Sequence, residues 1–213
     1  MKLLDGKKMA DQLQKELKAK ISRITGRKPT VAFILAGDDP ASKTYVNMKK
    51  KACEKIGIEY AGMELPAATT EDKLVEHILR LNKNPHINGI LVQLPLPKQI
   101  NANKIMQTIA PEKDVDGLHP VNQGKMLAGE SDCFFPCTPL GIKILLQKNN
   151  LSTEGKHVVI IGRSNIVGKP LAALLMQNAP GANATVTVLH RYSQNVKEIC
   201  LSADILVVAV GQA

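Results

Sequence analysis

The stretch HVVIIGRSNIVGKPLAALL, residues 157–175, has the pattern of a buried strand, a tight turn and a helix. Gly162 allows the turn to close, Gly168 allows the helix to pack near the strand, and Pro170 suits a first helical turn. Backbone N–H groups at such a helix start can bind phosphate. The spacing differs from G-x-G-x-x-G, because Ser164 replaces the second glycine and one residue is added. The pattern therefore fits a dinucleotide site and an ordinary strand-to-helix turn equally well.

The end of the next strand indicates which dinucleotide would fit. In NAD-type sites an acidic residue there bonds the ribose hydroxyls, whereas an arginine accommodates the 2′-phosphate of NADP. Here the strand TVTVLH, residues 185–190, is followed by Arg191, and no acid stands in that place. The sequence favours NADP over NAD, with Arg163 and Arg191 as candidate phosphate contacts. The alternative is that both are ordinary surface arginines.

Apolar runs alternate with helical periods along the chain, which predicts an α/β fold with parallel sheets in βαβ units. The expected strands are 31–37, 58–65, 87–97 (ended by Pro-Leu-Pro after Gln93), 157–162, 185–190 and 204–211. The expected helices are 5–24, 42–57, 71–83, 101–109, 138–149, one that opens near 168, and 195–202. The Pro-, Gly- and Asp-rich segment 111–139 is expected to be a loop that ends in the helix at 138–149.

Two α/β domains are expected, at residues 1–139 and 140–213, with 140–150 as a linking helix. The second is Rossmann-like. Only three strands follow residue 155 before the sequence stops at Gln212-Ala213, whereas a doubly wound dinucleotide domain commonly has six. We therefore expect the second domain to be incomplete at its C-terminus.

Length and composition predict a well-packed soluble protein. The chain has 213 residues, of which 44% are hydrophobic, enough for one large domain or two small ones. The longest apolar run, ILVVAV at 205–210, is too short to span a bilayer, and the first residues lack a cleavable signal. We expect a cytoplasmic protein without membrane contacts.

The net charge of +9 suits an anionic partner. However, the lysines are spread along the chain, aromatic residues make up only 3%, and no RNA or DNA motif occurs. The chain therefore has too few aromatic side chains for a surface on which bases stack, and we expect no nucleic-acid partner. Small phosphorylated or carboxylated molecules fit the charge equally well.

The four cysteines form no CxxC pair, and the chain has no export signal. This usage favours reduced thiols over a zinc site or a disulfide framework. No metal site is expected.

The segment SKTYVNMKKKACEKIG, residues 42–57, places one of its five lysines on an apolar arc. At about 100° per residue, Lys49 points into the middle of that arc. The arc contains Tyr45, Val46, Ala52, Cys53 and Ile56. A buried ammonium loses solvation, so Lys49 must either reach out to water or bind a partner. Reaching to water is the ordinary explanation.

Two further polar groups in the first half are candidates for a site. Gln93 lies at the carboxyl end of an apolar strand, where ligands of open α/β sheets collect, and we expect it to face Lys49. A strand-end glutamine without function is the alternative. The segment KDVDG, residues 113–117, carries Asp114 and Asp116. They build a turn, or one of them bonds an amino-heterocycle; the spacing does not fit a calcium loop.

Five motifs together resemble one family. They are T-Y-V-x-x-K at 44–49, VQLPLP at 92–97, P-x-KDVDG at 111–117, PCTP at 136–139 and GRSNIVGKP at 162–170. In this order and over most of the chain, they resemble the bifunctional methylenetetrahydrofolate dehydrogenase/methenyltetrahydrofolate cyclohydrolase family. The resemblance implies oxidation of 5,10-methylenetetrahydrofolate by NADP and hydrolysis of the methenyl product to 10-formyltetrahydrofolate, a step of one-carbon metabolism. It also implies a homodimer.

The resemblance assigns roles to individual residues. It implies that Lys49 is the catalytic lysine with Gln93 beside it, that Tyr45 stacks on the folate, and that Asp116 bonds the amine edge of the pterin. The predicted cofactor residues are Gly162 and Gly168 from the turn, and Arg163, Ser164 and Arg191 from the resemblance. Lys49, set in an apolar face, is then a candidate general acid and base.

Two rival interpretations remain. One is a non-catalytic remnant, such as a folate- or nucleotide-binding module or an association domain. The retention of Lys49, Gln93 and Asp116 together argues against it, and the expected missing end argues for it. The other is an NADP-dependent dehydrogenase of a different small acid, which would leave the set of Tyr, Lys, Gln and Asp unexplained.

Overall fold

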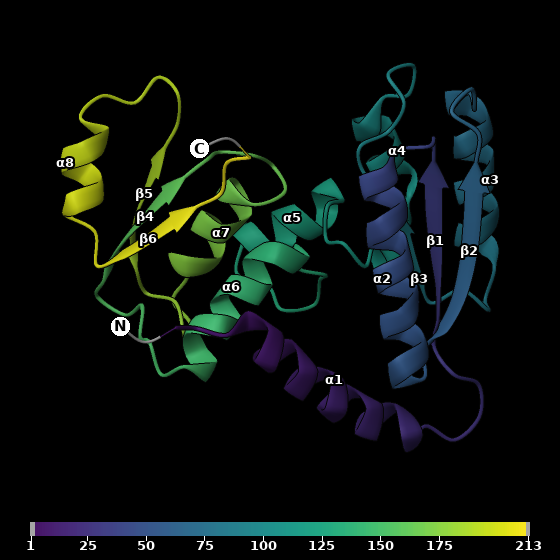
Figure 1. Cartoon of the computed structure of the whole chain (residues 1–213), viewed down its shortest axis with the longest axis horizontal. Coiled ribbons are helices and arrows are strands. Elements are labelled where there is room, and N and C mark those ends of the chain that lie inside the picture. Colours follow the sequence, from purple (N-terminus) through teal and green to yellow (C-terminus); the bar gives the residue numbers. More distant parts are fainter. Residues whose placement is uncertain (1–2, 212–213) are drawn as a thin grey trace. The chain divides into compact units, whose positions relative to one another are not determined.

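The computed structural model describes residues 3–211, which fall into two compact units (Figure 1). The first is Asp5–Val115, and the second comprises the described residues from Asp116 onward together with residues 3–4. This division precedes the segment 116–139, whereas the sequence placed a domain boundary after it. The predicted end of the second domain at Gln212-Ala213 lies outside the described residues.

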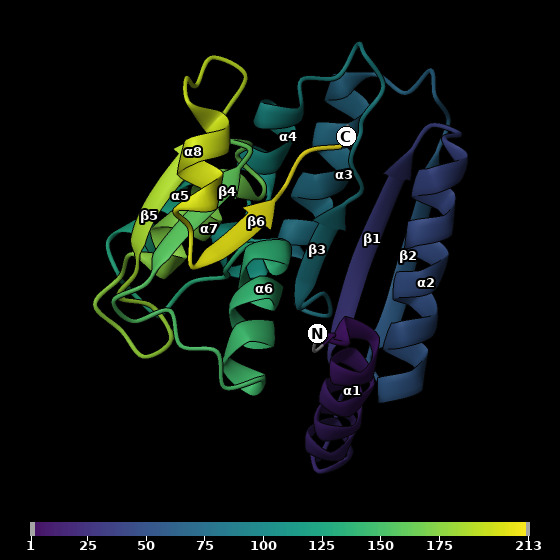
Figure 2. The same ribbon diagram turned by 60° about the vertical axis from the view of Figure 1, so that its left-hand side comes forward.

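The first unit is built on a parallel sheet of strand order β2-β1-β3. Its strands are β1 (Thr30–Ala36), β2 (Glu59–Leu65) and β3 (Gly89–Val92). Its helices are α1 (Gly6–Ser22), α2 (Pro40–Ile56), α3 (Glu71–Lys83), α4 (Ala102–Thr108) and the 3₁₀ helix η1 (Pro111–Lys113). Helix α2 covers one face of the sheet and α3 the other (Figure 2). The central strand β1 is therefore buried on both sides, which explains its continuous apolar sequence.

Helix α2 has clear start and stop signals. The carboxylate of Asp39 accepts a hydrogen bond from the backbone N–H of Ser42 at 2.7 Å, and Pro40 occupies the first turn. The helix ends at Gly57, whose φ of 87° is left-handed. Val46 and Cys53 are buried against the sheet. These signals fix which side chains α2 presents to the carboxyl ends of the strands.

The second unit contains a parallel sheet of strand order β5-β4-β6. Its strands are β4 (His157–Ile161), β5 (Thr185–Leu189) and β6 (Ile205–Val208). Its helices are α5 (Pro120–Leu127), α6 (Cys137–Lys148), α7 (Gly168–Leu175) and α8 (Val196–Leu201). Val158, Ile160, Leu171 and Leu175 form its fully buried core. The predicted fold class, two parallel-sheet α/β parts of which the second is Rossmann-like, is confirmed.

Helix α5 lies inside the segment 111–139, whose Pro-, Gly- and Asp-rich composition predicts a loop. It begins at Pro120, and His119 caps it by accepting a hydrogen bond from the backbone N–H of Val121 at 3.0 Å. Met126 is buried with Ala173 and Leu174 of α7. The helix is thus held by tertiary contacts with α7, and these contacts join the segment 116–139 to the second unit.

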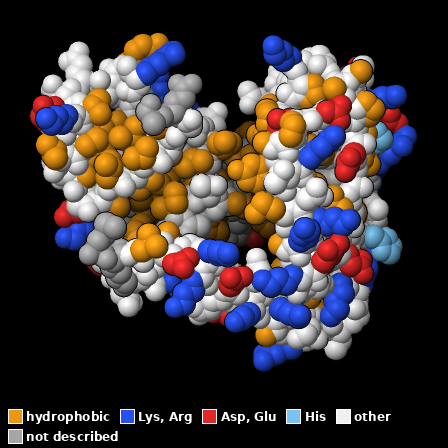
Figure 3. Space-filling model, in the orientation of Figure 1, with side chains coloured by type: hydrophobic (Ala, Val, Ile, Leu, Met, Phe, Trp, Pro, Cys, Tyr) orange, Lys and Arg blue, Asp and Glu red, His pale blue; other side chains and the backbone are white. Residues whose placement is uncertain are grey.

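The two units differ in surface character on the face drawn in Figure 3. Hydrophobic side chains gather over the β6 side of the second unit, where Leu206 and Val208 are exposed. The first unit shows many lysine and arginine side chains there. Within residues 3–211, no helix is long and apolar enough to cross a membrane. In the same range, no cluster of three or more His, Cys, Asp or Glu residues could hold a metal ion.

Candidate active site

Lys49 and Gln93 meet at the carboxyl end of the first sheet. Lys49 lies on α2, Gln93 directly follows β3, and the Lys49 Nζ donates a hydrogen bond to the Gln93 Oε1 at 3.2 Å. The backbone N–H of Gln93 continues the sheet by donating to the Ile34 carbonyl at 2.8 Å. The predicted approach of the two side chains is confirmed.

The amide of Gln93 is itself oriented. Its Nε2 donates to the carbonyl of Leu94 at 2.6 Å, so its Oε1 is the atom that faces the lysine. Because the partner is a neutral amide, it fixes the position of the Lys49 amine without adding a negative charge beside it. An ion pair with a carboxylate would instead hold the proton on the amine.

Lys49 differs from the lysines around it. Its side chain is half-buried, whereas Lys50, Lys51 and Lys55 are exposed. Lys55 pairs with the carboxylate of Asp11 at 3.2 Å, so its partner is charged. Among these four lysines, Lys49 alone combines partial burial with a neutral acceptor, which distinguishes it from a solvated basic face.

Tyr45 lies one helical turn before Lys49, on the same side of α2. The sequence placed its ring on the apolar arc, but the residue is 59% exposed. The buried arc is centred on Ser42, Val46 and Cys53, so Tyr45 falls at its margin. An exposed ring next to the lysine is available to stack on a planar ligand.

The two carboxylates of KDVDG have different surroundings. Asp114 is only 1% exposed and lies beside Ile90 of β3 in the first unit. Asp116 is partly exposed, belongs to the second unit, and accepts a hydrogen bond from the Cys137 thiol at 3.7 Å. Of the two, only Asp116 is accessible to a ligand, while Asp114 is part of the fold.

Lys113 was missed by the sequence analysis. Its ammonium donates to three backbone carbonyls at the end of α3: Leu81 at 3.1 Å, Asn82 at 2.7 Å and Asn84 at 2.8 Å. A cation is favoured at a helix C-terminus, where carbonyl groups lack helical partners. Lys113 thus ties the start of KDVDG to α3. The only sequence signal for this was the lysine itself, since its acceptors are distant in the chain.

The turn after β4 depends on both of its glycines. Gly162 has a φ of 122°, and an added Cβ would lie 2.6 Å from the Ala209 carbonyl oxygen. A Cβ at Gly168 would overlap the carbonyl oxygen of Gly162. The Ser164 hydroxyl accepts a hydrogen bond from the backbone N–H of Val167 at 3.1 Å and so closes the turn. Gly162, Ser164 and Gly168 therefore each have a geometric reason to be at their positions in the turn.

Arg163 and Arg191 come together around a third residue. The guanidinium carbon of Arg191 lies 4.7 Å from the centre of the Tyr192 ring, and that of Arg163 lies 5.7 Å from it. All three side chains are exposed. The structure thus joins the two arginines that the sequence proposed as phosphate contacts.

Comparisons with known proteins agree with this geometry. Residues 4–116 match the family model of the tetrahydrofolate dehydrogenase/cyclohydrolase catalytic domain, and residues 136–213 match the NAD(P)-binding domain of the same family. The chain belongs to the tetrahydrofolate dehydrogenase/cyclohydrolase family. The resemblance inferred from the five motifs is confirmed.

Individual members of the tetrahydrofolate dehydrogenase/cyclohydrolase family are similar along nearly the whole chain. The bifunctional protein FolD of Protochlamydia amoebophila is 54% identical over 99% of this chain and 72% of its own length. The crystal structure of FolD from Campylobacter jejuni has a TM-score of 0.95 at 43% identity, covering 99% of this chain and 74% of that one. A Trypanosoma brucei FolD structure, complexed with NADP cofactor and inhibitor, has a TM-score of 0.91 at 37% identity, covering 98% and 71%.

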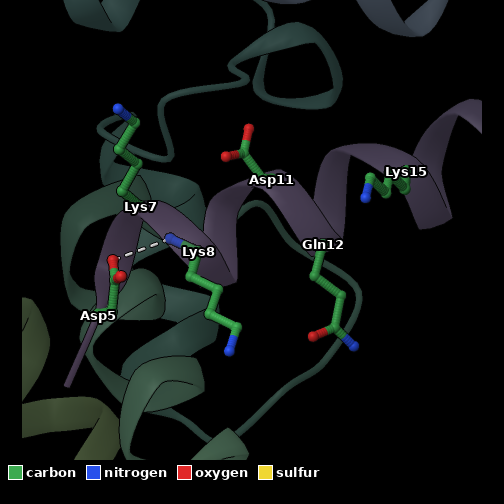
Figure 4. Close-up of a pocket in the computed structure, with 6 residues that line it drawn as sticks. All are labelled: Asp5, Lys7, Lys8, Asp11, Gln12 and Lys15. Atoms are coloured by element: carbon green, nitrogen blue, oxygen red, sulfur yellow. Dashed lines mark hydrogen bonds between the residues drawn. The ribbon is translucent and has the colours of Figure 1, made fainter.

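None of the residues that line a surface hollow of about 530 Å³ belongs to the five family motifs (Figure 4). It is lined by Asp5, Lys7, Lys8, Asp11, Gln12 and Lys15. All of these belong to α1 or its cap, and the Asp5 carboxylate accepts a hydrogen bond from the Lys8 backbone N–H at 3.0 Å. The hollow is a helix flank without apolar or aromatic side chains, so it does not suit a folate or a nucleotide.

Proposed function

We propose that Lys49 is the general acid and base of this enzyme and that Gln93 holds it in position. The enzyme oxidises 5,10-methylenetetrahydrofolate with NADP and hydrolyses the methenyl product to 10-formyltetrahydrofolate. The observation that carries the role of Lys49 is the 3.2 Å hydrogen bond from its Nζ to the neutral Gln93 amide. The matches to both domains of an enzyme family favour this function over a non-catalytic module.

Hydrolysis of the methenyl group requires proton transfers that Lys49 can perform. Water adds to the one-carbon bridge and loses a proton. The bond from that carbon to N5 then breaks, N5 gains a proton, and the added hydroxyl loses its proton to become the formyl oxygen. One amine that accepts a proton from water and returns it to nitrogen serves these steps. We propose that Lys49 does so while Tyr45 stacks on the folate and Asp116 bonds the pterin amine edge.

Oxidation of the methylene group makes smaller demands on acid–base groups. NADP, when bound, supplies the acceptor for the hydride. The protein must hold substrate and cofactor in a reactive orientation and exclude water. We therefore expect Lys49 to matter more to hydrolysis than to oxidation.

The turn after β4 fits a dinucleotide phosphate group. The glycines at 162 and 168 leave no room for side chains, so the backbone itself forms the surface there. Arg163 and Arg191 add two guanidinium groups, which suit a phosphate monoester. We propose that these four residues and Ser164 hold NADP, with Arg163 and Arg191 at its 2′-phosphate.

We also propose a functional division at 139/140, with residues 1–139 on the folate side and 140–213 on the NADP side, linked by 140–150. The hydrogen bond from Cys137 to Asp116 supports it, because it ties the end of the folate segment to a proposed folate contact. Alanine at Cys137 should then weaken folate binding without changing NADP binding. An equal effect on both ligands would contradict this division.

A comparison of two lysine variants tests the central proposal. Hydrolysis is measured as the decrease of the methenyl absorbance band with time. Lys49→Met should abolish this decrease, while folate binding falls much less. Lys51→Met is the matched control, since Lys51 lies on the same helix and is exposed. Unchanged hydrolysis in Lys49→Met, or equal loss in both variants, would refute the assignment.

From the family resemblance we further propose that the protein is a cytoplasmic homodimer. Sedimentation equilibrium of the purified protein should give twice the monomer mass at micromolar concentration, and cell fractionation should place it in the soluble fraction. A monomer at that concentration, or recovery with membranes, would contradict the respective proposal.

A further inference from the structure

Tyr192 follows the second strand of the nucleotide sheet and has no role in the site described so far. Its ring is 66% exposed, yet it contacts two guanidinium groups, those of Arg163 and Arg191. An exposed aromatic ring that contacts two like charges is unusual enough to need an explanation.

The sheet register explains why these three side chains meet. Strands β4 and β5 are parallel neighbours in which Ile161 is paired with Leu189. Arg163 and Arg191 each lie two residues beyond that pair, so they leave the sheet at the same level. The turn and the strand end therefore deliver both guanidinium groups to the carboxyl edge of the sheet.

The two guanidinium groups carry like charges and lie near the same ring, so they repel each other. The face of an aromatic ring carries negative electrostatic potential and attracts a cation within about 6 Å of its centre. Both guanidinium carbons lie inside that range of the Tyr192 ring. The ring thus offsets the repulsion while the N–H groups of both arginines remain available for a phosphate.

The backbone of Tyr192 is fixed by a short hydrogen-bonded turn. Its N–H donates to the Nδ1 of His190 at 3.2 Å. The N–H of His190 donates to the Ser193 hydroxyl at 2.9 Å, and the N–H of Ser193 donates to the His190 carbonyl at 2.8 Å. These bonds fix the backbone from which the Tyr192 ring extends toward the two arginines.

We propose that Tyr192 is a positioning residue that holds Arg163 and Arg191 as one phosphate-binding pair and thereby sets the preference for NADP over NAD. This proposal rests on the role assigned to the two arginines above. It gives Tyr192 a function through the arginines, with no contact of its own to the phosphate.

Binding measurements on the full chain test this role without relying on catalysis. The probes are adenosine 2′,5′-bisphosphate, which carries the 2′-phosphate, and adenosine 5′-monophosphate, which lacks it. Isothermal titration calorimetry gives the dissociation constant of each for Tyr192→Phe, Tyr192→Leu and the loop control Gln194→Ala. Thermal unfolding of each variant checks that the fold is retained.

Tyr192→Leu should weaken binding of the bisphosphate about tenfold and leave the monophosphate nearly unchanged, because two exposed cation–π contacts are lost. Tyr192→Phe and Gln194→Ala should both match the unmodified protein, since the ring face rather than the hydroxyl acts on the arginines. Equal weakening of both probes by Tyr192→Leu would mean that the ring stacks on the base, and would overturn the proposal. No effect of Tyr192→Leu would overturn it as well.

Arginine variants separate this proposal from the one it rests on. The double variant Arg163→Ala/Arg191→Ala should lose affinity for the bisphosphate. Adding Tyr192→Leu to this double variant should cause no further loss of affinity. If the arginine variant keeps its affinity, the phosphate role of the arginines is wrong. If it loses affinity but Tyr192→Leu alone does not, only the role of Tyr192 is wrong.

Discussion

The helix that follows the central strand begins in opposite electrostatic surroundings in the two units. In the first, the Asp39 carboxylate caps α2 through the Ser42 N–H. In the second, Val167 stands at the start of α7 and makes no side-chain cap, while Lys169 lies in the first turn. A helix start favours an anion. The first unit supplies that anion from its own chain, whereas no side chain caps α7, which is consistent with the proposal that a cofactor phosphate binds there.

This difference shows how one topology serves two tasks. Both sheets are parallel and have their first strand in the centre, in the orders β2-β1-β3 and β5-β4-β6. The fold therefore does not decide which unit binds phosphate. The residues between strand and helix decide it: 37–39 in the first unit and 162–167 in the second.

The close contact between Gly168 and the Gly162 carbonyl, in the turn between β4 and α7, gives the largest expected effect. Gly168→Ala should push α7 away from the strand, because the added Cβ overlaps the Gly162 carbonyl oxygen. We expect a loss of about 3 kcal/mol in the free energy of unfolding, typical of overpacking, together with loss of NADP binding. Urea unfolding and titration with NADP measure the two effects.

Gly124→Ala on α5 is the matched control for that substitution. A Cβ at Gly124 meets no atom within 4 Å. Alanine there should be neutral or stabilise the helix by about 0.5–1 kcal/mol. If Gly168→Ala changed the free energy of unfolding and NADP binding as little as Gly124→Ala, the turn would not depend on close packing between β4 and α7.

A carboxylate added at the start of α7 would make it resemble the start of α2, which Asp39 caps. Val167→Asp should weaken NADP binding about tenfold relative to Val167→Asn, because only the aspartate adds a negative charge where a phosphate is expected. The two variants have nearly the same shape, so their difference isolates charge. Equal affinities in fluorescence titrations with NADPH would show that the start of α7 does not face the cofactor phosphates.

Much of the fold followed from local pattern. Alternating apolar runs predicted the strands of both sheets, and Gly162 and Gly168 marked the turn. The approach of Lys49 to Gln93 followed from a helix face and a strand end, both of which have fixed periods. Features of this kind rest on the regular periods of a helix and a strand and on the rule that ligands collect at the carboxyl ends of parallel strands, so the sequence is enough to predict them.

The rest depends on partners distant in sequence. Helix α5 was missed because contacts of Met126 with Ala173 and Leu174 stabilise it. Tyr192 was missed because its relation to Arg163 needs the register of β4 and β5. Such contacts follow from packing and strand pairing, which no local pattern specifies.

The Asp39 cap of α2 gives the smallest expected effect, and this effect depends on pH. Hydrogen bonds from Ser42, from its side chain and then its backbone N–H, lower the pKa of Asp39 below the usual 3.8. The ionised carboxylate therefore stabilises the folded state above pH 3.8, and this contribution is lost as pH falls through the lower pKa of the folded state. An asparagine in place of Asp39 would also cap the helix but cannot titrate.

Comparing the unmodified protein with Asp39→Asn isolates that contribution, because the other carboxylates titrate in both. The midpoints of thermal unfolding should be nearly equal at pH 6, and the unmodified protein should lose a few degrees relative to the variant by pH 3. A difference that stays constant from pH 6 to pH 3 would mean that the carboxylate does not cap α2. The start of α2 would then have no more of an anionic cap than the start of α7. The contrast between the two units would rest on Arg163 and Arg191 alone.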